Sequence, residues 1–444
     1  MSNLNDNEMD VEEAEDQVES DDDLQEDEED DEEEESSEDE AGEDKTFLPG
    51  DKIEEGEELE VDENAYVVYH QASLGPPCLS FDIVADQTTP DFPLSLTAVA
   101  GTQAAKVTAN SILVFRMSNL HCVRPLGEDE DEENIEEAEE EKPVLKMCGL
   151  KHQGTVNRIR YSLLGPTPVV ATWSETGSVS VWNITAALQK LDQPGKESGG
   201  REVATPLQSF TGHSAEGFAL DWSRADPGLL ASGDCNKNIH VWKPGDGGQW
   251  AVSEAFRSHT GSVEDIKWSP NEATVMASCS CDKTIKIWDI RAQPSKACML
   301  TQGNAHTADV NVIDWNRNDP FIVSGGDDGV VKVWDLRNFS GLSDPVAVFK
   351  HHSAPVTSVE WHHDDTSVFA SSGADHQVAQ WDLALERDAE VEQEEPHMKD
   401  LPPQLLFIHQ GLKDVKEIHW HQKVPGLMMA TSHTGFDIFR TISV

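Results

Sequence analysis

Three pairs of closely spaced histidines or cysteines are the residues in this sequence most suited to metal chemistry. The pairs are Cys279 and Cys281, His362 and His363, and His419 and His421. Thiolate and imidazole are preferred zinc ligands, but a closed zinc site needs four ligands in a fixed geometry. No second pair stands at a suitable spacing from any of them. We therefore expect these side chains to serve packing, and we expect no metal ion and no cofactor.

The motifs of common catalytic and nucleotide-binding sites do not occur in the sequence. It has no GxxxxGK[ST], no GxSxG and no HExxH, which are the spacings of a phosphate-binding loop, a nucleophile elbow and a zinc-protease helix. The stretch GDGGQ at 245–249 is typical of a loop between strands. The sequence therefore favours a binding protein over an enzyme.

Carboxylates are the second chemical feature, and they are concentrated in two tracts. The 444 residues carry a formal net charge of −53, from 85 acidic and 32 basic side chains. Residues 1–44 hold 26 acidic and no basic side chains, and residues 128–141 hold 11 more, which leaves 48 acidic residues elsewhere. Runs of like charge repel and bury little apolar surface. We therefore predict a disordered acidic arm over 1–63, and acidic inserts at 127–142 and 386–400.

An internal repeat indicates which elements position the rest of the chain. Three segments share a His, an alternating apolar stretch ending in Trp, a small-residue stretch, a turn with Asp and a closing Trp-Asp; they are residues 259–289, 306–335 and 352–382. Within TIKIWDI, Ile285 and Ile287 alternate with Lys286, which is the period of a β-strand. Weaker copies of the pattern run from His213 to Trp242, from His152 to Trp182, from His409 to Phe439 and from His70 to Phe115.

These units resemble WD repeats, and the resemblance covers about residues 64–444. It implies an all-β, seven-bladed WD-repeat β-propeller with one four-stranded blade per repeat. The last segment, GFDIFRTISV, ends after the third strand of its blade, whereas the segment 65–70 has strand composition before the first full blade. We predict that this segment pairs with the C-terminal blade and closes the ring, which removes an exposed sheet edge.

In WD repeats the His, a Ser or Thr, the turn Asp and the Trp form a hydrogen-bonded relay inside a blade. The resemblance assigns this structural relay to the triads His259, Asp282 and Trp288; His306, Asp328 and Trp334; and His352, Asp375 and Trp381. Asn236 takes the turn position in the blade of His213, and Thr176 takes it in the blade of His152. We expect weaker relays in those two blades.

Two segments are similar to histone-binding WD proteins of the retinoblastoma-binding type. YHQASLGPPCLSFDIV (69–84) resembles the start of their first blade, and DLPPQLLFIHQG (400–411) resembles a loop that forms part of their binding groove. The resemblance implies a partner-binding site at Asp400, Pro402, Pro403, Leu405, Leu406 and Phe407. A long N-terminal helix forms the other wall in that family, but residues 49–66 here carry two glycines and few apolar residues, which disfavours such a helix.

The complete arrangement resembles the glutamate-rich WD-repeat family. The similarity rests on the acidic arm, SLGPPCLSFDIV, LSLTAVAGTQA, the acidic insert before KPVLK, and LPPQLLFIHQG. It implies a nuclear and nucleolar protein, with some in the cytoplasm, that acts in ribosome assembly and escorts basic clients. Those clients would be large-subunit ribosomal protein three and histones, with pre-ribosomal particles as further partners.

A flexible polyanion suits such clients, because it neutralises Lys and Arg and speeds their encounter by electrostatic steering. We assign this role to Glu32, Glu33, Glu34, Glu35, Asp129, Asp131, Glu132 and Glu133. Phosphorylation at Ser20, Ser36 and Ser37, which lie among acidic residues, would add to the charge. The alternative is that the tracts only keep the protein soluble. We expect no direct binding of nucleic acid by like charges, no membrane segment and a monomer.

A different class of function is suggested by WDIR (288–291) and WDLR (334–337). Both match the WDxR box of substrate receptors in cullin-based ubiquitin ligases, in which the Arg docks on an adaptor propeller. Arg291 and Arg337 would then be adaptor-docking residues. The alternative is that each Arg forms a local ion pair at the end of an ordinary blade.

Overall fold

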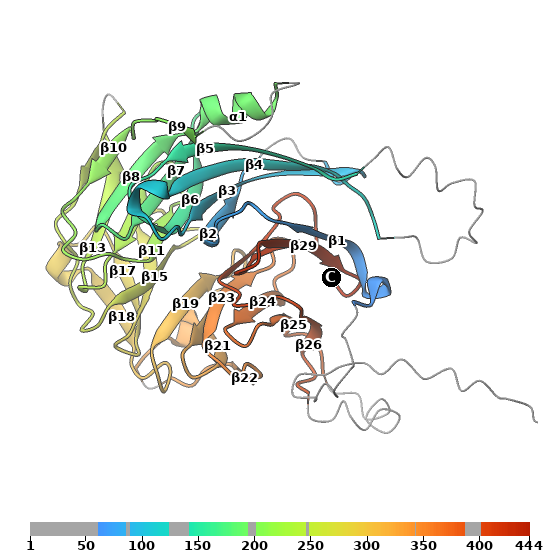
Figure 1. The fold of residues 1–444 in the computed structure, drawn as a ribbon. Coiled ribbons are helices and arrows are strands. Elements are labelled where there is room, and N and C mark those ends of the chain that lie inside the picture. Colours follow the sequence, from blue (N-terminus) through green and yellow to red (C-terminus); the bar gives the residue numbers. More distant parts are fainter. Residues whose placement is uncertain are drawn as a thin grey trace, which may run out of the picture. The chain divides into compact units, whose positions relative to one another are not determined.

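Strands account for nearly all the regular structure, and they form seven sheets arranged around a common axis (Figure 1). The structure is a computed structural model, which describes residues 61–85, 89–123, 142–193, 201–245, 248–341, 343–386 and 401–444. Across these residues the sheets confirm the predicted seven-bladed β-propeller. We number the blades one to seven by the order of their first strands.

Blades one to three contain the N-terminal half of the described chain. Blade one holds β2 (Cys78–Ile83), β3 (Leu94–Thr102), β4 (Ser111–Leu120), β5 (Val144–Lys151) and the short parallel strand β9 (Arg201–Glu202). Blade two holds β6 (Val156–Leu164), β7 (Thr167–Ser174), β8 (Ser178–Asn183) and β10 (Gln208–Phe210). Blade three holds β11 (Ala219–Trp222), β12 (Leu230–Gly233), β13 (Ile239–Pro244) and β14 (Trp250–Val252).

Blades four to seven follow the clearest copies of the repeat. Blade four holds β15 (Val263–Trp268), β16 (Val275–Ser280), β17 (Ile285–Asp289) and β18 (Cys298–Gln302). Blade five holds β19 (Val310–Trp315), β20 (Phe321–Gly326), β21 (Val330–Asp335) and β22 (Ala347–Lys350). Blade six holds β23 (Val356–Trp361), β24 (Val368–Gly373), β25 (Val378–Asp382) and β26 (Leu405–His409). Blade seven holds β27 (Glu417–Trp420), β28 (Leu427–Thr431), β29 (Phe436–Thr441) and β1 (Tyr66–Ala72).

Blade seven joins the two ends of the described chain. β1 pairs antiparallel with β29, with Tyr66 opposite Thr441 and His70 opposite Ile438, and Figure 1 shows β1 in blue beside the red β29. The predicted closure is therefore confirmed, with the strand beginning at Tyr66 and ending at Ala72. The short turn η1 (Glu63–Ala65) precedes β1.

Helical structure is sparse among the described residues. The helix α1 (Thr185–Leu191) packs on blades one and two through the buried Ala187 and Leu191. The remaining helical turns are η2 (Val107–Ala109), η5 (Pro294–Lys296) and η6 (Leu336–Asn338). No helix in the described ranges is long and apolar enough to span a bilayer.

The core lies between the blades rather than at one centre. The first strand of each blade contacts the first strand of the next, and β27 completes the ring against β2. Seven apolar clusters fill the spaces between neighbouring blades of the described chain. In β17, Ile285 and Ile287 face blade five, whereas Trp288 faces blade three. Each sheet is thus buried on both faces, so even Lys286 is 8% exposed.

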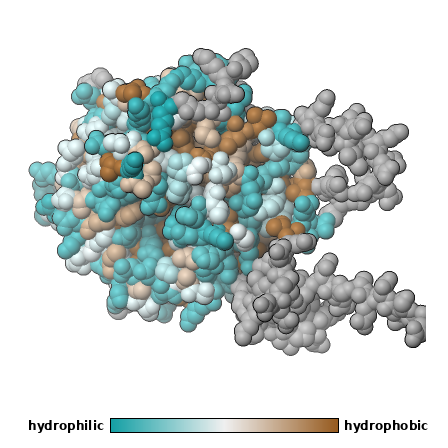
Figure 2. Space-filling model, viewed as in Figure 1, coloured by the Kyte–Doolittle hydropathy of each residue, from teal (hydrophilic) through white to brown (hydrophobic). Residues whose placement is uncertain are grey.

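The surface in Figure 2 is mostly hydrophilic on the face shown. Hydrophobic side chains gather over the outer strands β4 and β5 and near the end of the chain (Figure 2). The exposed apolar residues there include Val144 at 41% and Ile442 at 60%. Apolar side chains concentrated at the side of a blade are candidates for contact with a partner.

Candidate partner-binding surface and inner polar network

The outer edge of blade six carries the segment predicted to contact a partner. Pro402, Pro403 and the residues Leu405, Leu406 and Phe407 are all half-buried. The amide of Leu405 donates to the carbonyl of Pro402 at 3.0 Å, which forms the turn into β26. β26 lies at the end of its sheet and pairs only with β25 among the described strands. An edge strand with apolar side chains can bind a partner through its backbone and its side chains together. Asp400 lies outside the described residues.

Aromatic side chains from β1 extend this edge into blade seven. The ring of Tyr66 meets Phe407 edge to face at 5.4 Å between centroids and stacks on Tyr69 at 5.1 Å. Leu405 packs against the apolar cluster between blades five and six, and Phe407 packs against the cluster between blades six and seven. Leu406 and Ile408 belong to neither cluster and are therefore the apolar β26 side chains left for contact with a partner. We call Pro402–Phe407 with Tyr66 and Tyr69 the β26 edge.

His409 connects the β26 edge to the closure of the ring. Its Nδ1 lies 2.7 Å from the Tyr66 hydroxyl, and its Nε2 lies 3.3 Å from the carboxylate of Asp437 in β29. The same ring stacks on Phe439 at 4.1 Å between centroids. Burial and the nearby Asp437 raise the pKa of Tyr69 to about 12, so both tyrosines stay neutral at physiological pH. The sequence did not reveal Tyr66 as the partner of His409, because the two are 343 positions apart.

The three predicted relays have the same geometry in blades four, five and six. The His Nδ1 lies 2.9–3.1 Å from the turn Asp, and Nε2 lies 2.7–2.8 Å from a Ser hydroxyl. The Trp indole donates to the same Ser at 2.8–2.9 Å. Burial raises the pKa of Asp282, but hydrogen bonds from His259 outweigh it and hold that pKa well below its ordinary value. These residues therefore satisfy one another inside the blades.

The prediction of a weaker relay at His213 is wrong. Its Nδ1 lies 3.0 Å from Asp234 and its Nε2 lies 2.8 Å from Ser232, which also accepts from the Trp242 indole. Asp234 follows the small-residue strand directly and precedes the expected turn position by two residues. Asn236 instead donates to the hydroxyl of Ser214. Burial raises the pKa of Asp234, but hydrogen bonds from His213 and Asn238 bring it down to about 2.

Of the remaining weaker repeats, those of His152 and His70 show no carboxylate in contact with the histidine among the described residues, whereas His409 contacts Asp437. His152 contacts the Gly154 carbonyl at 2.9 Å and the Thr172 hydroxyl at 3.2 Å. Burial lowers its pKa, in agreement with a neutral ring. His70 lies in β1, where its Nε2 is 3.0 Å from the His121 carbonyl. The segment starting at His70 is therefore the closing strand of blade seven rather than the start of a relay in blade one.

The two WDxR arginines occupy equivalent exposed places after β17 and β21. The side chain of Arg291 is 70% exposed and pairs in a bidentate manner with Asp289, and Arg337 is 67% exposed and pairs likewise with Asp335. The hydrogen bonds with these carboxylates raise the pKa of each guanidinium. The local ion pair considered as the alternative is thus formed, and both arginines remain open to solvent.

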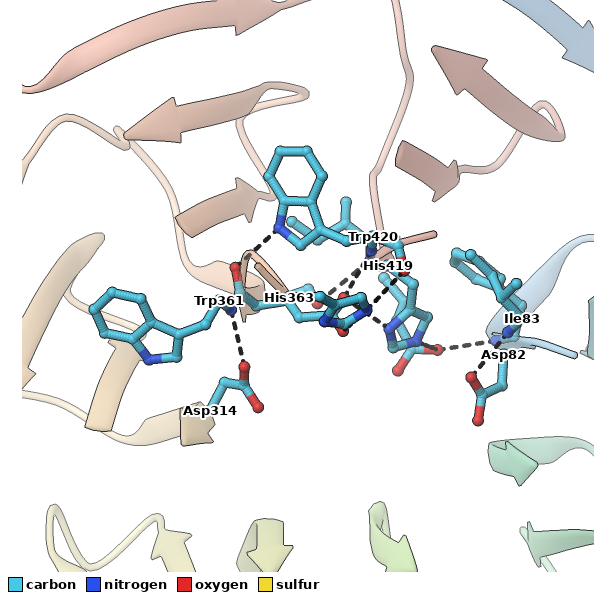
Figure 3. Close-up of polar contacts among 12 residues, drawn as sticks. Asp82, Ile83, Asp314, Trp361, His363, His419 and Trp420 are labelled. Carbon is cyan, nitrogen blue, oxygen red and sulfur yellow. Dashed lines mark hydrogen bonds and ion pairs between the residues drawn. The ribbon is translucent and has the colours of Figure 1, made fainter. Parts of the chain in front are cut away.

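A ring of ionisable side chains on the first strands was not predicted. One residue stands at the same position in each blade: Asp82, Arg160, Asp221, Lys267, Asp314, Glu360 and His419. The four carboxylates each accept a hydrogen bond from a backbone amide of the next blade, at 2.7–2.9 Å. Figure 3 shows Asp82, Asp314 and His419 of this ring, together with the neighbouring Trp361, His363 and Trp420. A charged residue directly before Trp, repeated in five blades, is the sequence signal that could have revealed it.

His419 carries a positive charge within this ring. Its Nδ1 lies 3.1 Å from Glu360 and its Nε2 lies 3.7 Å from Glu417. Burial lowers its pKa, but these carboxylates outweigh burial and raise it to about 9. The sequence suggested only a packing role for His419. The structure shows in addition that it is a buried cation.

Glu417 joins three blades through one buried carboxylate. It lies 2.5 Å from Arg158 and 2.7 Å from Arg160, both in β6. Its other oxygen accepts from the Ser80 hydroxyl at 2.7 Å and from the Phe81 amide at 2.9 Å, both in β2. The carboxylate thereby couples the last blade to the first two.

The remaining predicted site residues carry less structural information. Cys279 is buried, and Cys281 contacts the carboxylate of Glu264 at 3.1 Å. Within the described ranges, no group of three or more His, Cys, Asp or Glu residues is arranged to hold a metal ion. Several predicted positions lie outside the described residues: Ser20, Glu32, Glu33, Glu34, Glu35, Ser36, Ser37, Asp129, Asp131, Glu132 and Glu133.

Comparison with known families matches two parts of the chain. The family of the histone-binding protein RBBP4, which is also a component of the CAF1 complex, matches residues 56–121, which include β1 to β4. The family described as "WD domain, G-beta repeat" matches residues 204–243, 250–289, 297–335 and 343–382. The chain is also similar in fold to the WD40 beta propeller domain of Doa1, with a TM-score of 0.57, 14% identity, and coverage of 85% of this chain and 97% of that one.

Three curated proteins are similar over most of the chain. Protein HEAT STRESS TOLERANT DWD 1 of Arabidopsis thaliana is 40% identical, over 90% of this chain and 92% of its own. Ribosome assembly protein rrb1 of Schizosaccharomyces pombe is 38% identical, over 89% and 84% respectively. Glutamate-rich WD repeat-containing protein 1 of Dictyostelium discoideum is 42% identical, over 88% and 83%.

Proposed function

The chain belongs to the WD-repeat family that includes ribosome assembly protein rrb1 and Glutamate-rich WD repeat-containing protein 1, and we propose that it escorts a basic client protein in ribosome assembly. As a WD-repeat propeller it is a scaffold, and these two relatives carry no enzymatic name. The proposed client is a large-subunit ribosomal protein, with histones as a further client. The proposed place of action is the nucleus and nucleolus.

The observation that carries this proposal is the β26 edge. It combines a strand edge that has no partner strand among the described residues, a half-buried apolar run and two tyrosines. Its β1 side also falls within the segment 56–121 that is similar to the histone-binding family. In the proposed division of labour, the β26 edge selects the client and the acidic tracts neutralise its Lys and Arg side chains.

The experiment compares two leucines on outer strands of different blades. Leu406→Ser should weaken binding of a purified large-subunit ribosomal protein three or core histone about tenfold, because burial of a Leu side chain contributes about 1.5–3 kcal/mol. Leu300→Ser is the matched control, since Leu300 is 42% exposed on β18 in blade four. Affinity is measured by isothermal titration calorimetry in dilute salt. Equal affinities of the two variants would remove the β26 edge from the proposal.

A second candidate function rests on the exposure of Arg291 and Arg337. Both guanidinium groups lie at equivalent blade ends, where a cullin-ligase adaptor could contact them. Under this hypothesis, Arg291→Ala with Arg337→Ala abolishes co-purification of the adaptor and leaves binding of the basic client unchanged. Retention of the adaptor by the double variant would exclude docking through these arginines.

A further inference from the structure

A polar cavity lies where the first strands of blades three to six end. Its volume is about 60 Å³, which exceeds the roughly 10–15 Å³ that one water needs. Residues at equivalent places in consecutive blades line it. They include the carboxylates Asp221, Asp314 and Glu360, and the guanidinium groups Arg224 and Arg317.

The carboxylates of this cavity already have partners within the ring. Asp221 accepts from the Trp268 amide at 2.7 Å, and Asp314 accepts from the Trp361 amide at 2.9 Å. Lys267 lies 3.4 Å from Asp314, and burial of Lys267 is outweighed by the surrounding carboxylates, which raise its pKa. The partner of Glu360 is the protonated His419, at 3.1 Å. Asp314 and Glu360 are thus paired with cations of the ring, whereas Asp221 has only the amide contact, and burial raises the pKa of Asp221 to about 6.

The donors of the cavity are not compensated in this way. Among the described residues, neither Arg224 nor Arg317 has a carboxylate within ion-pair distance. Burial and the charge of Arg224 lower the pKa of Arg317 to about 10. Nη2 of Arg317 lies 3.3 Å from Nε2 of His363. The same Nε2 of His363 also lies 3.1 Å from the Trp420 carbonyl, and it cannot both accept from Arg317 and donate to that carbonyl. Two guanidinium groups therefore line one cavity, and most of their donors have no partner among the described residues, although Arg224 is exposed to water.

The indole of Trp361 gives the second, independent observation. Trp222, Trp268 and Trp420 stand at the same position in other blades, and each donates its indole N–H to a carbonyl of the preceding blade at 3.0–3.2 Å. Trp361 is 2% exposed and lines the cavity, yet its Nε1 has no partner in the described chain. In Figure 3 no contact reaches this nitrogen. A buried donor without an acceptor is costly, so an acceptor in the cavity would be favoured.

We propose that this cavity is a binding site for one oxyanion, a carboxylate or a phosphate group, held by Arg224, Arg317 and the indole N–H of Trp361. Guanidinium groups match such anions in shape and make charge-assisted hydrogen bonds to them. The group bound at this site would be negatively charged, whereas the proposed client is positively charged. The protein could then contact a basic and an acidic partner group at once, through separate surfaces.

The test follows the indole N–H signals of the full-length, 15N-labelled protein by NMR at constant ionic strength. Sodium phosphate and sodium acetate are titrated separately, and Trp361→Phe assigns the signal. The Trp361 signal should shift and saturate with at least one anion. The double variant Arg224→Gln with Arg317→Gln should weaken binding of that anion at least tenfold. Arg291→Gln with Arg337→Gln is the matched control, because it removes two exposed guanidinium groups elsewhere and should leave the titration unchanged.

The two arms identify the source of the oxyanion. A response to phosphate alone assigns a phosphate site, a response to acetate alone assigns a carboxylate site, and a response to both assigns a general oxyanion site. No saturable shift with either anion, or equal affinities for the cavity variant and the control, would overturn the proposal. Thermal unfolding checks that the double variant is folded; if it is not, Arg224→Gln replaces it, since Arg224 is exposed.

Discussion

Single carboxylates satisfy several buried donors inside the blades of this protein. Asp234 illustrates the principle, because it accepts from His213 and from both the backbone amide and the side chain of Asn238. Its oxygens are 0% exposed, so water cannot replace a lost partner. The neighbouring Asn236 is exposed and makes one side-chain contact to Ser214.

We therefore predict a large difference between two substitutions two residues apart. Asp234→Ala should lower the free energy of unfolding by about 1–3 kcal/mol, since it leaves buried donors unpaired. Asn236→Ala should change it by less than about 0.5 kcal/mol, as is usual for surface positions. Urea denaturation measures both values. A larger loss from Asn236→Ala would show that the turn position, and not Asp234, supports His213.

Loss of the proton from His419 at alkaline pH should lower the free energy of unfolding. Its pKa is about 9 in the folded chain against an ordinary value of 6.5. Its contribution is therefore complete below pH 6.5 and is lost as pH rises through 9. We predict that the free energy of unfolding falls by roughly 3 kcal/mol across this window.

The variant His419→Asn isolates that effect. Its unfolding free energy should vary less between pH 6.5 and 9.5 than that of the wild type, measured by urea denaturation at each pH. His363→Asn is the control, because burial lowers the pKa of His363 to about 3 and that residue does not titrate in this window. Parallel profiles for the wild type and His419→Asn would contradict the assignment.

Closure of the ring depends on one element, the strand β1. It completes blade seven by pairing with β29, and Tyr66 locks it through the hydrogen bond to His409. Without β1, the unpaired edge of β29 would be open to another chain. Glu417 supports the same junction from the inside, where it joins blade seven to blades one and two.

We predict that a chain starting at residue 73 self-associates, whereas a chain starting at residue 61 stays monomeric. The two differ mainly in η1 and β1. Size-exclusion chromatography with light scattering measures the mass of each in solution. A stable monomer from the shorter chain would mean that β1 is dispensable for closure.

Charge is the property of the whole molecule that bears most directly on its proposed role. The net charge is −53, and 37 acidic residues lie in only two tracts. Exposed charges are screened over about 8 Å at physiological salt. Binding of a basic client through these tracts should therefore weaken as salt rises.

Deleting residues 1–44 and 128–141 together tests this division of labour. The deletion should weaken binding of a large-subunit ribosomal protein or histone in dilute salt and flatten the dependence of affinity on salt, because the steering charges are lost. The thermal midpoint should change little, since the strands of the described blades all lie outside the deleted residues. Unchanged affinity and unchanged salt dependence would leave solubility as the role of the tracts.

The sequence by itself determined the number of blades, the residues of three relays and the strand that closes the ring. The repeats are regular along the chain. The 28- or 29-residue spacing of His259 and Trp288 and of their counterparts, together with the resemblance to WD repeats, was therefore enough to place them. The resemblance of residues 400–411 to histone-binding WD proteins also led to the prediction of a partner-binding segment there, which includes Pro402 and Pro403.

Only the tertiary structure decided the contacts between blades. Tyr66 reaches His409 across 343 positions, and Glu417 reaches Arg160 across 257. It also decided that Asp234 replaces Asn236 as the acceptor for His213, because the choice depends on how the turn directs each side chain. The charge of His419 and the free indole of Trp361 follow from neighbours in other blades. Burial and hydrogen-bond partners arise from folding around the ring, and a linear pattern does not contain them.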